Sequence, residues 1–145
     1  GADHVISHRK DMAAQLATLG IEGVDYVLCL NDTDGHWRTL VEIVAPQGHI
    51  CSIVETSAPV DIGPLKNKSA SFSWELMFTR SMFGTPDMIE QHRLLEEASS
   101  LVEAGKLRAT NSQVVAPIHA ANLRKAHAQI ETGRTIGKIV LENWS

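Results

Sequence analysis

The chain has 145 residues, of which 43% are hydrophobic and 21% are charged, and its formal net charge is −4 at pH 7. This length and composition are typical of one globular domain with a real core. The acidic balance argues against a general nucleic-acid partner, because no basic stripe is available to displace counterions from phosphates. The sequence contains no run of about 18 apolar residues. It also starts directly on folded-looking residues, so we expect no membrane span, no signal peptide and a cytoplasmic location.

The first twenty residues predict a short strand and a helix. The segment 2–7 contains an apolar pair around Val5, which suits a brief strand. Asp11 is a capping residue that can begin a helix, and Gly20 can end it, because apolar residues recur between them at helical spacing. The basic residues 8–10 at the end of the strand either meet a phosphate or form a solvated turn.

The stretch 23–55 carries the clearest fold signal. The run Val24–Leu30 is nearly continuously apolar, which predicts a strand covered on both faces, as in a parallel sheet. Turn and capping residues follow at 31–34, and apolar residues at 37–44 then recur with the spacing of one helix face. A second apolar run, Ile50–Val54, completes a β-α-β unit. Ligands of such units gather at the carboxyl ends of the strands.

Those strand ends are the first candidates for the walls of a site. Asn31 and Asp32 follow the first strand, and Val54 and Glu55 close the second. The side chains of Asp32 and Thr33 can hydrogen-bond a ligand hydroxyl or cap the following helix, and the two roles are compatible.

The remaining chain continues the alternation of strands and helices. Period-two alternation of aromatic and polar residues at 69–83 predicts a strand. Arg80, near its end, suits either an anion contact or a salt bridge at a subunit interface. The other predicted elements are a loop at 57–67, a helix that starts at Thr85-Pro86-Asp87 and stops at Gly105, a strand at 109–116, a helix at 120–131 and a strand at 138–142. The order predicts an α/β fold with a mostly parallel sheet.

Motifs that would assign a chemistry directly are missing from the sequence. It has no G-x-G-x-x-G, P-loop, G-x-S-x-G or C-x-x-C pattern, so neither a nucleophile nor a phosphate-binding turn is visible. The histidines form no H-E-x-x-H motif, and the two cysteines, Cys29 and Cys51, have no near partner. We expect both cysteines to be small buried hydrophobic residues of a reducing compartment, and we expect no metal ligands in this chain.

Six segments, taken together, carry a family resemblance. They are GADHVI at 1–6, GVDYVLCL at 23–30, LVEIVAPQGHICSI at 40–53, WELMFTRSMF at 74–83, LVEAGKLR at 101–108 and AANLRKAHAQIETGRTIGKIVL at 120–141. In this order they resemble the C-terminal half of the medium-chain dehydrogenase/reductase superfamily. They are similar in particular to its bacterial zinc-type alcohol dehydrogenase-like group, which is related to the quinone oxidoreductases. The resemblance covers nearly the whole chain, and WELMFTRSMF is its most specific segment.

The resemblance implies a Rossmann-like fold, with a mostly parallel sheet and flanking helices, that is incomplete. Residues 1–145 correspond to the C-terminal part of the nucleotide-binding domain, and 138–145 return toward a GroES-like, barrel-like catalytic domain. That domain and the first β-α-β unit, with its glycine-rich turn, are absent from the chain. They would hold the substrate contacts, the choice between NAD and NADP, and the zinc ligands of those members that use zinc. The resemblance thus assigns no catalytic residue here.

Cofactor-binding positions are also implied by the resemblance. They comprise the two strand ends, a segment near the nicotinamide and a cation near the cofactor phosphate: Asn31, Asp32, Val54, Glu55, Phe78, Thr79, Arg80 and Arg134. The segment 69–80 resembles the edge strand through which relatives pair their subunits, which implies a homodimer. The implied cofactor is NADP or NAD, and the implied substrate is a small molecule.

The usual strand order of this fold, 3-2-1-4-5-6, makes the strand at Val5 the third and the strand at Val24 the fourth. The two strands between them are absent from the chain, and exposed strand edges invite pairing with another chain. We therefore expect the chain on its own to oligomerise through strand edges or to leave 1–19 poorly packed.

The favoured function is the cofactor-binding half of an NAD(P)H-dependent oxidoreductase that acts on a small carbonyl, alcohol or enone. In such enzymes the protein positions the nicotinamide and the cofactor carries the chemistry. We expect these 145 residues alone to be inactive, because they lack the phosphate-binding turn. The alternative is a non-catalytic module for nucleotide binding or dimerisation. A hydrolase or transferase is disfavoured, because no nucleophile motif is present.

Overall fold

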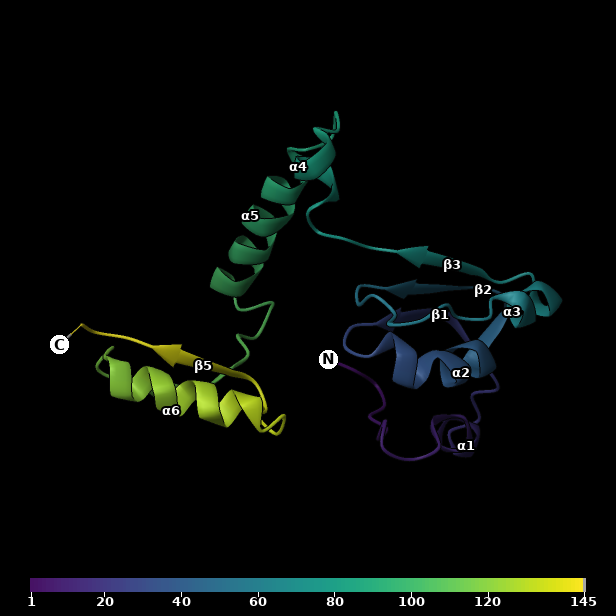
Figure 1. The fold of residues 1–145 in the computed structure, drawn as a ribbon, viewed down its shortest axis with the longest axis horizontal. Helices are drawn as coiled ribbons and strands as arrows, with labels where there is room; N and C mark the ends of the chain where they lie inside the picture. Colours follow the sequence, from purple (N-terminus) through teal and green to yellow (C-terminus); the bar gives the residue numbers. More distant parts are fainter. Residues whose placement is uncertain (145) are drawn as a thin grey trace. The chain divides into compact units, whose positions relative to one another are not determined.

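The computed structural model describes residues 1–144 of the chain. The chain divides into two compact units, of which the first ends at Thr85 and the second begins at Pro86 (Figure 1). The first unit contains α1 (Met12–Thr18), β1 (Val24–Cys29), α2 (Thr33–Ile43), β2 (Val44–Ser52), α3 (Gly63–Lys68), β3 (Ser71–Trp74) and α4 (Thr79–Phe83). The second contains α5 (Glu90–Glu103), β4 (Asn111–Val115), α6 (Ala120–Glu131) and β5 (Lys138–Leu141).

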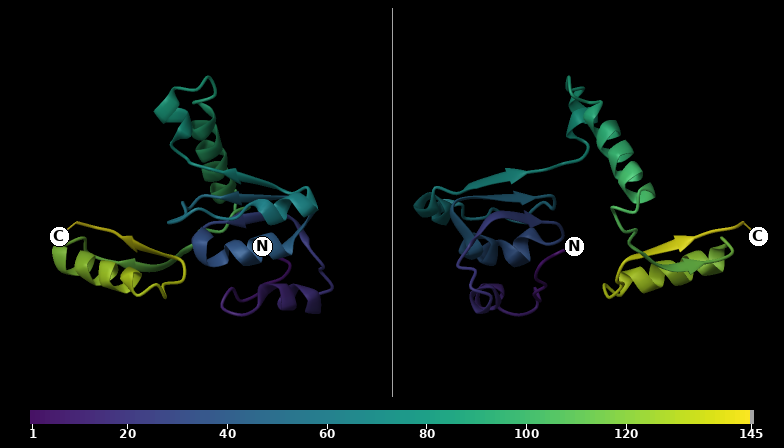
Figure 2. Two further views of the ribbon diagram at one scale, coloured as in Figure 1. Left: turned by 45° about the vertical axis from the view of Figure 1, so that its right-hand side comes forward. Right: turned by 180° about the vertical axis from the view of Figure 1, so that it is seen from behind.

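The first unit is built on a parallel sheet of three strands in the order β1-β2-β3. The register aligns Val27 with Ile50 and Ile50 with Phe72. Helix α2 connects β1 to β2 and lies against one face of the sheet (Figures 1 and 2). The predicted β-α-β unit and the mostly parallel α/β fold are therefore confirmed.

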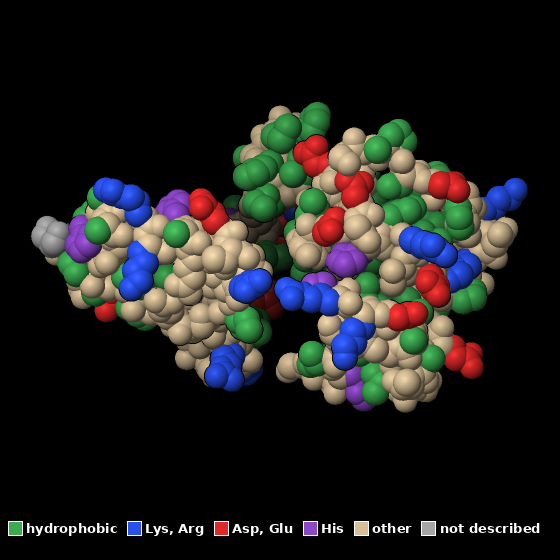
Figure 3. Space-filling view, turned by 60° about the horizontal axis from the view of Figure 1, so that its bottom comes forward, with side chains coloured by type: hydrophobic (Ala, Val, Ile, Leu, Met, Phe, Trp, Pro, Cys, Tyr) green, Lys and Arg blue, Asp and Glu red, His purple; other side chains and the backbone are tan. Residues whose placement is uncertain are grey.

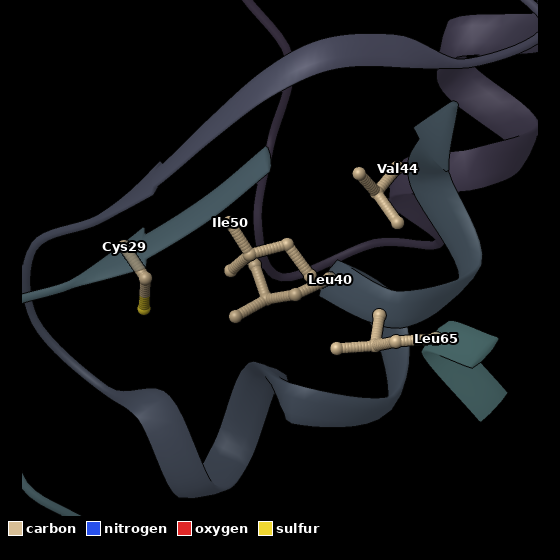
Figure 4. Close-up of a cluster of buried hydrophobic side chains, with 5 residues drawn as sticks. All are labelled: Cys29, Leu40, Val44, Ile50 and Leu65. Atoms are coloured by element: carbon tan, nitrogen blue, oxygen red, sulfur yellow. The ribbon is translucent and has the colours of Figure 1, made fainter. Parts of the chain in front are cut away.

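The core of the first unit lies between α2, α3 and one face of the sheet. Its buried side chains come from two strands and both helices: Cys29, Leu40, Val44, Ile50 and Leu65 (Figure 4). Trp37 of α2 packs edge-on against Phe72 of β3, with ring centroids 5.1 Å apart. Gly48 permits the close approach of β1 and β2, because a Cβ there would lie 3.0 Å from the Asp25 carbonyl oxygen.

The other face of this sheet is uncovered within the first unit. Tyr26 and Leu28 of β1 are 79% and 62% exposed. Tyr26 stacks on His49 of β2, and His49 shares a hydrogen bond with Ser71 of β3, so a row of side chains crosses all three strands. On the side of the molecule that Figure 3 shows, hydrophobic side chains are also visible among charged and polar ones. The prediction that β1 is covered on both faces is thus wrong for this unit.

The predicted strand at 2–7 is wrong. The structure has no strand in this segment, and Val5 is 89% exposed. A strand exists only through hydrogen bonds to a neighbour, and within the described residues β1 pairs with β2 alone. Val5 and Val24 are therefore not neighbours in a sheet. The helix predicted after Asp11 is confirmed, since the Asp11 carboxylate accepts a hydrogen bond from the Ala14 N–H at 2.9 Å.

Four other boundaries differ from the predictions. The second strand of the β-α-β unit, predicted at 50–54, is β2 at Val44–Ser52, which begins directly after α2. The strand predicted at 69–83 is confined to β3, because the chain turns after Trp74 and forms the short helix α4. The predicted loop at 57–67 contains α3, in which Pro64 occupies the first turn, where a missing N–H costs nothing. The helix predicted from Thr85 begins only at Glu90, after a turn in which the Glu90 N–H donates to the Asp87 carbonyl at 2.9 Å.

The second unit contains a two-stranded parallel sheet, β4-β5, and α6 runs alongside it (Figure 2). Gln129 of α6 donates to Gln113 of β4 at 3.1 Å. The predicted helix at 120–131 is confirmed, and His119 caps it by accepting from the Asn122 N–H at 3.3 Å. The segment predicted to return toward a further domain, 138–145, begins with β5, and its last residue lies outside the described residues.

Candidate functional site

The carboxyl ends of β1 and β2 meet at one edge of the sheet. The Ile53 N–H donates to the Cys29 carbonyl oxygen at 3.2 Å, so the chain leaving β2 stays beside the end of β1. The Thr33 hydroxyl donates to the Val54 carbonyl oxygen at 2.5 Å. The structure therefore brings the Asn31–Asp32 segment and the Val54–Glu55 segment together, as expected for the ends of neighbouring parallel strands.

Asp32 acts as the N-cap of α2. Its carboxylate accepts a hydrogen bond from the Gly35 N–H at 2.8 Å, which satisfies one of the free donors at the start of the helix. A Cβ at Gly35 would lie 2.3 Å from the Asp32 carboxylate, so a larger residue at this position would displace the capping group. The capping role weighed for Asp32 in the sequence is the one that the structure shows.

Asp34 ties the segment after β2 to the first turn of α2. Its carboxylate accepts a hydrogen bond from the Ser57 backbone N–H at 2.8 Å. This bond and one from the Ser57 side chain hold the pKa of Asp34 below its ordinary value, because both stabilise the ionised carboxylate. Sequence reasoning missed this contact, since nothing in the spacing of the two residues signals it.

Two buried hydroxyl groups lie beneath the surface of the site, where β2 ends and α2 begins. Thr33 and Ser52 are 1% and 0% exposed, and their oxygens are 2.5 Å apart. Thr33 begins α2 and Ser52 ends β2, so the pair joins the two elements at the carboxyl edge. Thr33 was identified in the sequence as a capping or ligand-binding residue, whereas Ser52 carries no signal apart from its place at a strand end.

A cavity of about 330 Å³ opens beside the end of β1. Asn31 lines it together with Cys29 and Leu40, and the rings of His8 and His36 meet edge-on at its wall, with centroids 5.9 Å apart. Asn31 and Glu55 are both exposed, so a ligand at this edge can reach their side chains. Of the predicted basic segment 8–10, His8 is the residue that lines this cavity.

The remaining site candidates lie on other elements. Phe78 and Thr79 begin α4, where Thr79 donates its N–H to the Leu76 carbonyl at 3.0 Å, and Arg80 is half-buried in the same helix. Arg134 lies in the second unit, exposed in the turn after α6, where its N–H donates to the Thr132 hydroxyl at 3.3 Å.

Residues 1–144 contain no group of three or more His, Cys, Asp or Glu side chains that could hold a metal ion. Both cysteines are free, with Cys29 buried in β1 and Cys51 half-buried in β2. The described residues therefore do not fit a zinc site, and we assign no zinc-dependent step to them. No helix within 1–144 is both long enough and apolar enough to cross a membrane.

Comparison with known proteins gives consistent matches over almost the whole chain. A family model described as zinc-binding dehydrogenase matches residues 1–141. A zinc-type alcohol dehydrogenase-like protein of Staphylococcus aureus is 39% identical over 141 residues, which make up 97% of this chain and 42% of that protein. A quinone oxidoreductase of Pseudomonas aeruginosa is 31% identical over 112 residues, or 72% of this chain and 31% of that protein.

Solved structures match as well. A Rhizobium etli protein assigned as a zinc-dependent alcohol dehydrogenase is 48% identical, with a TM-score of 0.88, and the match covers 100% of this chain and 42% of that one. A quinone oxidoreductase of Pseudomonas syringae, at 20% identity and a TM-score of 0.68, shares the fold over 93% of this chain and 41% of its own. The chain thus spans about two fifths of the length of these relatives.

Proposed function

The chain belongs to the zinc-binding dehydrogenase family, and from this premise we propose that it is the later part of the nucleotide-binding domain of an NAD(P)-dependent oxidoreductase. The proposed substrate is a small carbonyl compound, alcohol or enone. The bound nicotinamide would supply hydride transfer, and the protein's part is to hold and orient it. Because the sequence contains no glycine-rich phosphate-binding turn, we expect no turnover by these 145 residues alone.

One observation carries the proposal, namely the convergence of two strand ends at the carboxyl edge of a parallel sheet. In open α/β sheets this edge is where nucleotides bind. Thr33 links the end of β1 to Val54, and the exposed side chains of Asn31 and Glu55 lie on the two linked segments. An amide offers donors and acceptors and a carboxylate offers acceptors, which suits the hydroxyl groups of a ribose.

The other candidate residues have narrower roles in this proposal. Phe78, Thr79 and Arg80 would lie near the nicotinamide, and Arg134 would meet a phosphate of the cofactor. Asp32 would contribute through its position at the start of α2, because its carboxylate already caps the helix. The zinc used by some family members would have to be bound by residues other than these.

We also propose a homodimer that forms through the segment 69–80. Within the described residues β3 pairs with β2 alone, so its outer edge is open. Unpaired N–H and C=O groups on such an edge are a template for pairing with another chain. The open edge also favours the second candidate function, a non-catalytic dimerisation module.

A titration of NADPH and NADH, followed by nucleotide fluorescence, tests the proposal. It is performed once with these 145 residues and once with the protein made from the complete reading frame that contains them. We expect saturable binding by the latter and no saturable change with the 145 residues. Tight binding by the 145 residues would mean that the site is misplaced, and absence of binding by the complete protein would favour the dimerisation module.

A further inference from the structure

We propose that Thr33 and Ser52 form a positioning pair that sets the spacing between the two strand-end segments of the nucleotide site. The inference rests on the proposed function and adds residues that touch no nucleotide. It starts from the buried hydroxyl groups at the base of the site, which need hydrogen-bond partners because a buried hydroxyl without one is costly.

The number of hydroxyl protons decides which group of the pair donates and which accepts. Thr33 has one hydroxyl proton, and the Val54 carbonyl oxygen, 2.5 Å away, can only accept it. Ser52 therefore donates to the Thr33 oxygen, also at 2.5 Å, since its other acceptors, the carbonyl oxygens of Cys29 and Val54, lie at 3.4 and 3.5 Å. The result is a hydrogen-bond relay in which Ser52 donates to Thr33 and Thr33 donates to the Val54 carbonyl oxygen.

These two hydrogen bonds fix one end of the segment 54–57 to the start of α2. The other end is fixed by the Asp34 carboxylate, which accepts the Ser57 N–H at 2.8 Å. The residue that carries the proposed ligand contact on this side, Glu55, lies between the two ties. The opposite wall, Asn31 with Asp32, directly precedes Thr33 in the sequence, so one residue is bonded to both walls.

The Thr33–Ser52 pair therefore has a positioning role in addition to its place in the core. Its two hydroxyl groups hold the Val54 carbonyl against α2, and this sets how far Glu55 stands from Asn31. Loss of the Thr33 hydroxyl would leave the sheet and the helix in place but release 54–57 at one end. The cofactor would then have to order that segment on binding, which weakens affinity without altering the hydride step.

The test uses the complete reading-frame protein and the variants Thr33→Val, Thr33→Ser and Thr39→Val. Valine has the shape of threonine without its donor, and serine restores the donor. Thr39, a half-buried threonine farther along α2, serves as the control for the Thr→Val change itself. We measure hydrogen exchange at 54–57 and at Ile50, the dissociation constant for NADPH or NADH, and kcat and KM for the nucleotide.

For Thr33→Val we expect faster exchange at 54–57 with Ile50 unchanged, a dissociation constant and KM raised about tenfold, and an unchanged kcat. Thr33→Ser and Thr39→Val should behave like the unmodified protein. If Thr33→Val fails to fold, Ser52→Ala is measured instead. It removes the orienting donor and keeps the Thr33–Val54 bond, and we expect it to raise the dissociation constant for the nucleotide about threefold.

Two results would overturn the inference in distinguishable ways. Faster exchange in Thr33→Val or Ser52→Ala with an unchanged dissociation constant would mean that the pair only stabilises the fold, and the proposed function would stand. Absence of nucleotide binding by the unmodified protein would refute the proposed function itself, and the positioning role would fall with it.

Discussion

Lys68 shows how a single side chain completes an element far from it in the sequence. Its ammonium group donates to the carbonyl oxygens of Val41, Glu42 and Val44 at 3.0, 2.7 and 2.7 Å. These carbonyls lie at the C-terminus of α2, where helices leave acceptors without partners and where a positive charge is favourable. Helix α2 has no basic residue in its own last turn, so Lys68 of α3 supplies the missing cap.

We predict that Lys68→Met lowers the free energy of unfolding by about 1–3 kcal/mol, because the aliphatic stem is kept and the charged hydrogen bonds are lost. Lys66→Met is the matched control, since Lys66 is exposed on the same helix, and it should change stability by less than about 0.5 kcal/mol. Urea unfolding followed by circular dichroism measures both. Equal effects of the two substitutions would contradict the capping role.

Residues that act on their near neighbours were predictable, and residues that act across the fold were not. Capping is the role predicted for Asp11 and one of the two roles predicted for Asp32, because a capping side chain bonds a backbone N–H only a few residues on. The contacts of Lys68 with Val41 and of Ser52 with Thr33 join positions 27 and 19 residues apart, so they leave no local pattern in the sequence. The walls at Asn31 and Val54 could be placed only because parallel strands end at a common edge.

Most of the wrong predictions concern short segments of the first unit. Alternation at 69–83 predicts one strand, but only Ser71–Trp74 pairs with β2, and α4 follows. Helix α3 has only six residues and packs into the core through Leu65, so tertiary contact stabilises it more than propensity does and its sequence shows little period. The prediction of α6 is confirmed, and so are the kinds of element in the β-α-β unit, although its second strand lies at Val44–Ser52 and not at 50–54.

The open edge of β3 gives a prediction about assembly. In a parallel strand the backbone groups of alternate residues point to the same side, and the Glu75 N–H points toward β2, where it donates to the Ser52 carbonyl at 2.9 Å. The N–H of Trp74 therefore points to the open side. Trp74→Pro removes that donor and keeps the pairing of β3 with β2, whereas Trp74→Ala removes the ring alone.

If the homodimer forms through β3, Trp74→Pro should be monomeric at concentrations where Trp74→Ala still dimerises. Light scattering coupled to size-exclusion chromatography measures the two masses. We expect the dissociation constant of the dimer to rise at least about tenfold more for proline than for alanine, as for the loss of a backbone hydrogen bond. Identical masses for the two variants at all concentrations would rule out pairing at this edge.

At the scale of the whole molecule, the order of the elements predicts the fold and the six sequence segments predict the family, and both predictions are confirmed. The sheet, its crossover helix and the family match at residues 1–141 agree with one another. The sequence provides neither a set of metal ligands within 1–144 nor a glycine-rich turn. We therefore propose one task for this chain, which is to form a wall of a nucleotide site.

Hydrogen exchange of the complete reading-frame protein, with and without saturating NADPH or NADH, tests that task most directly. If the two strand ends form the wall, the nucleotide should slow exchange at 29–34 and 52–57, while exchange of the Tyr26 amide, in the middle of β1, stays unchanged. Slower exchange confined to residues after Pro86, or no change anywhere in the first unit, would contradict the account.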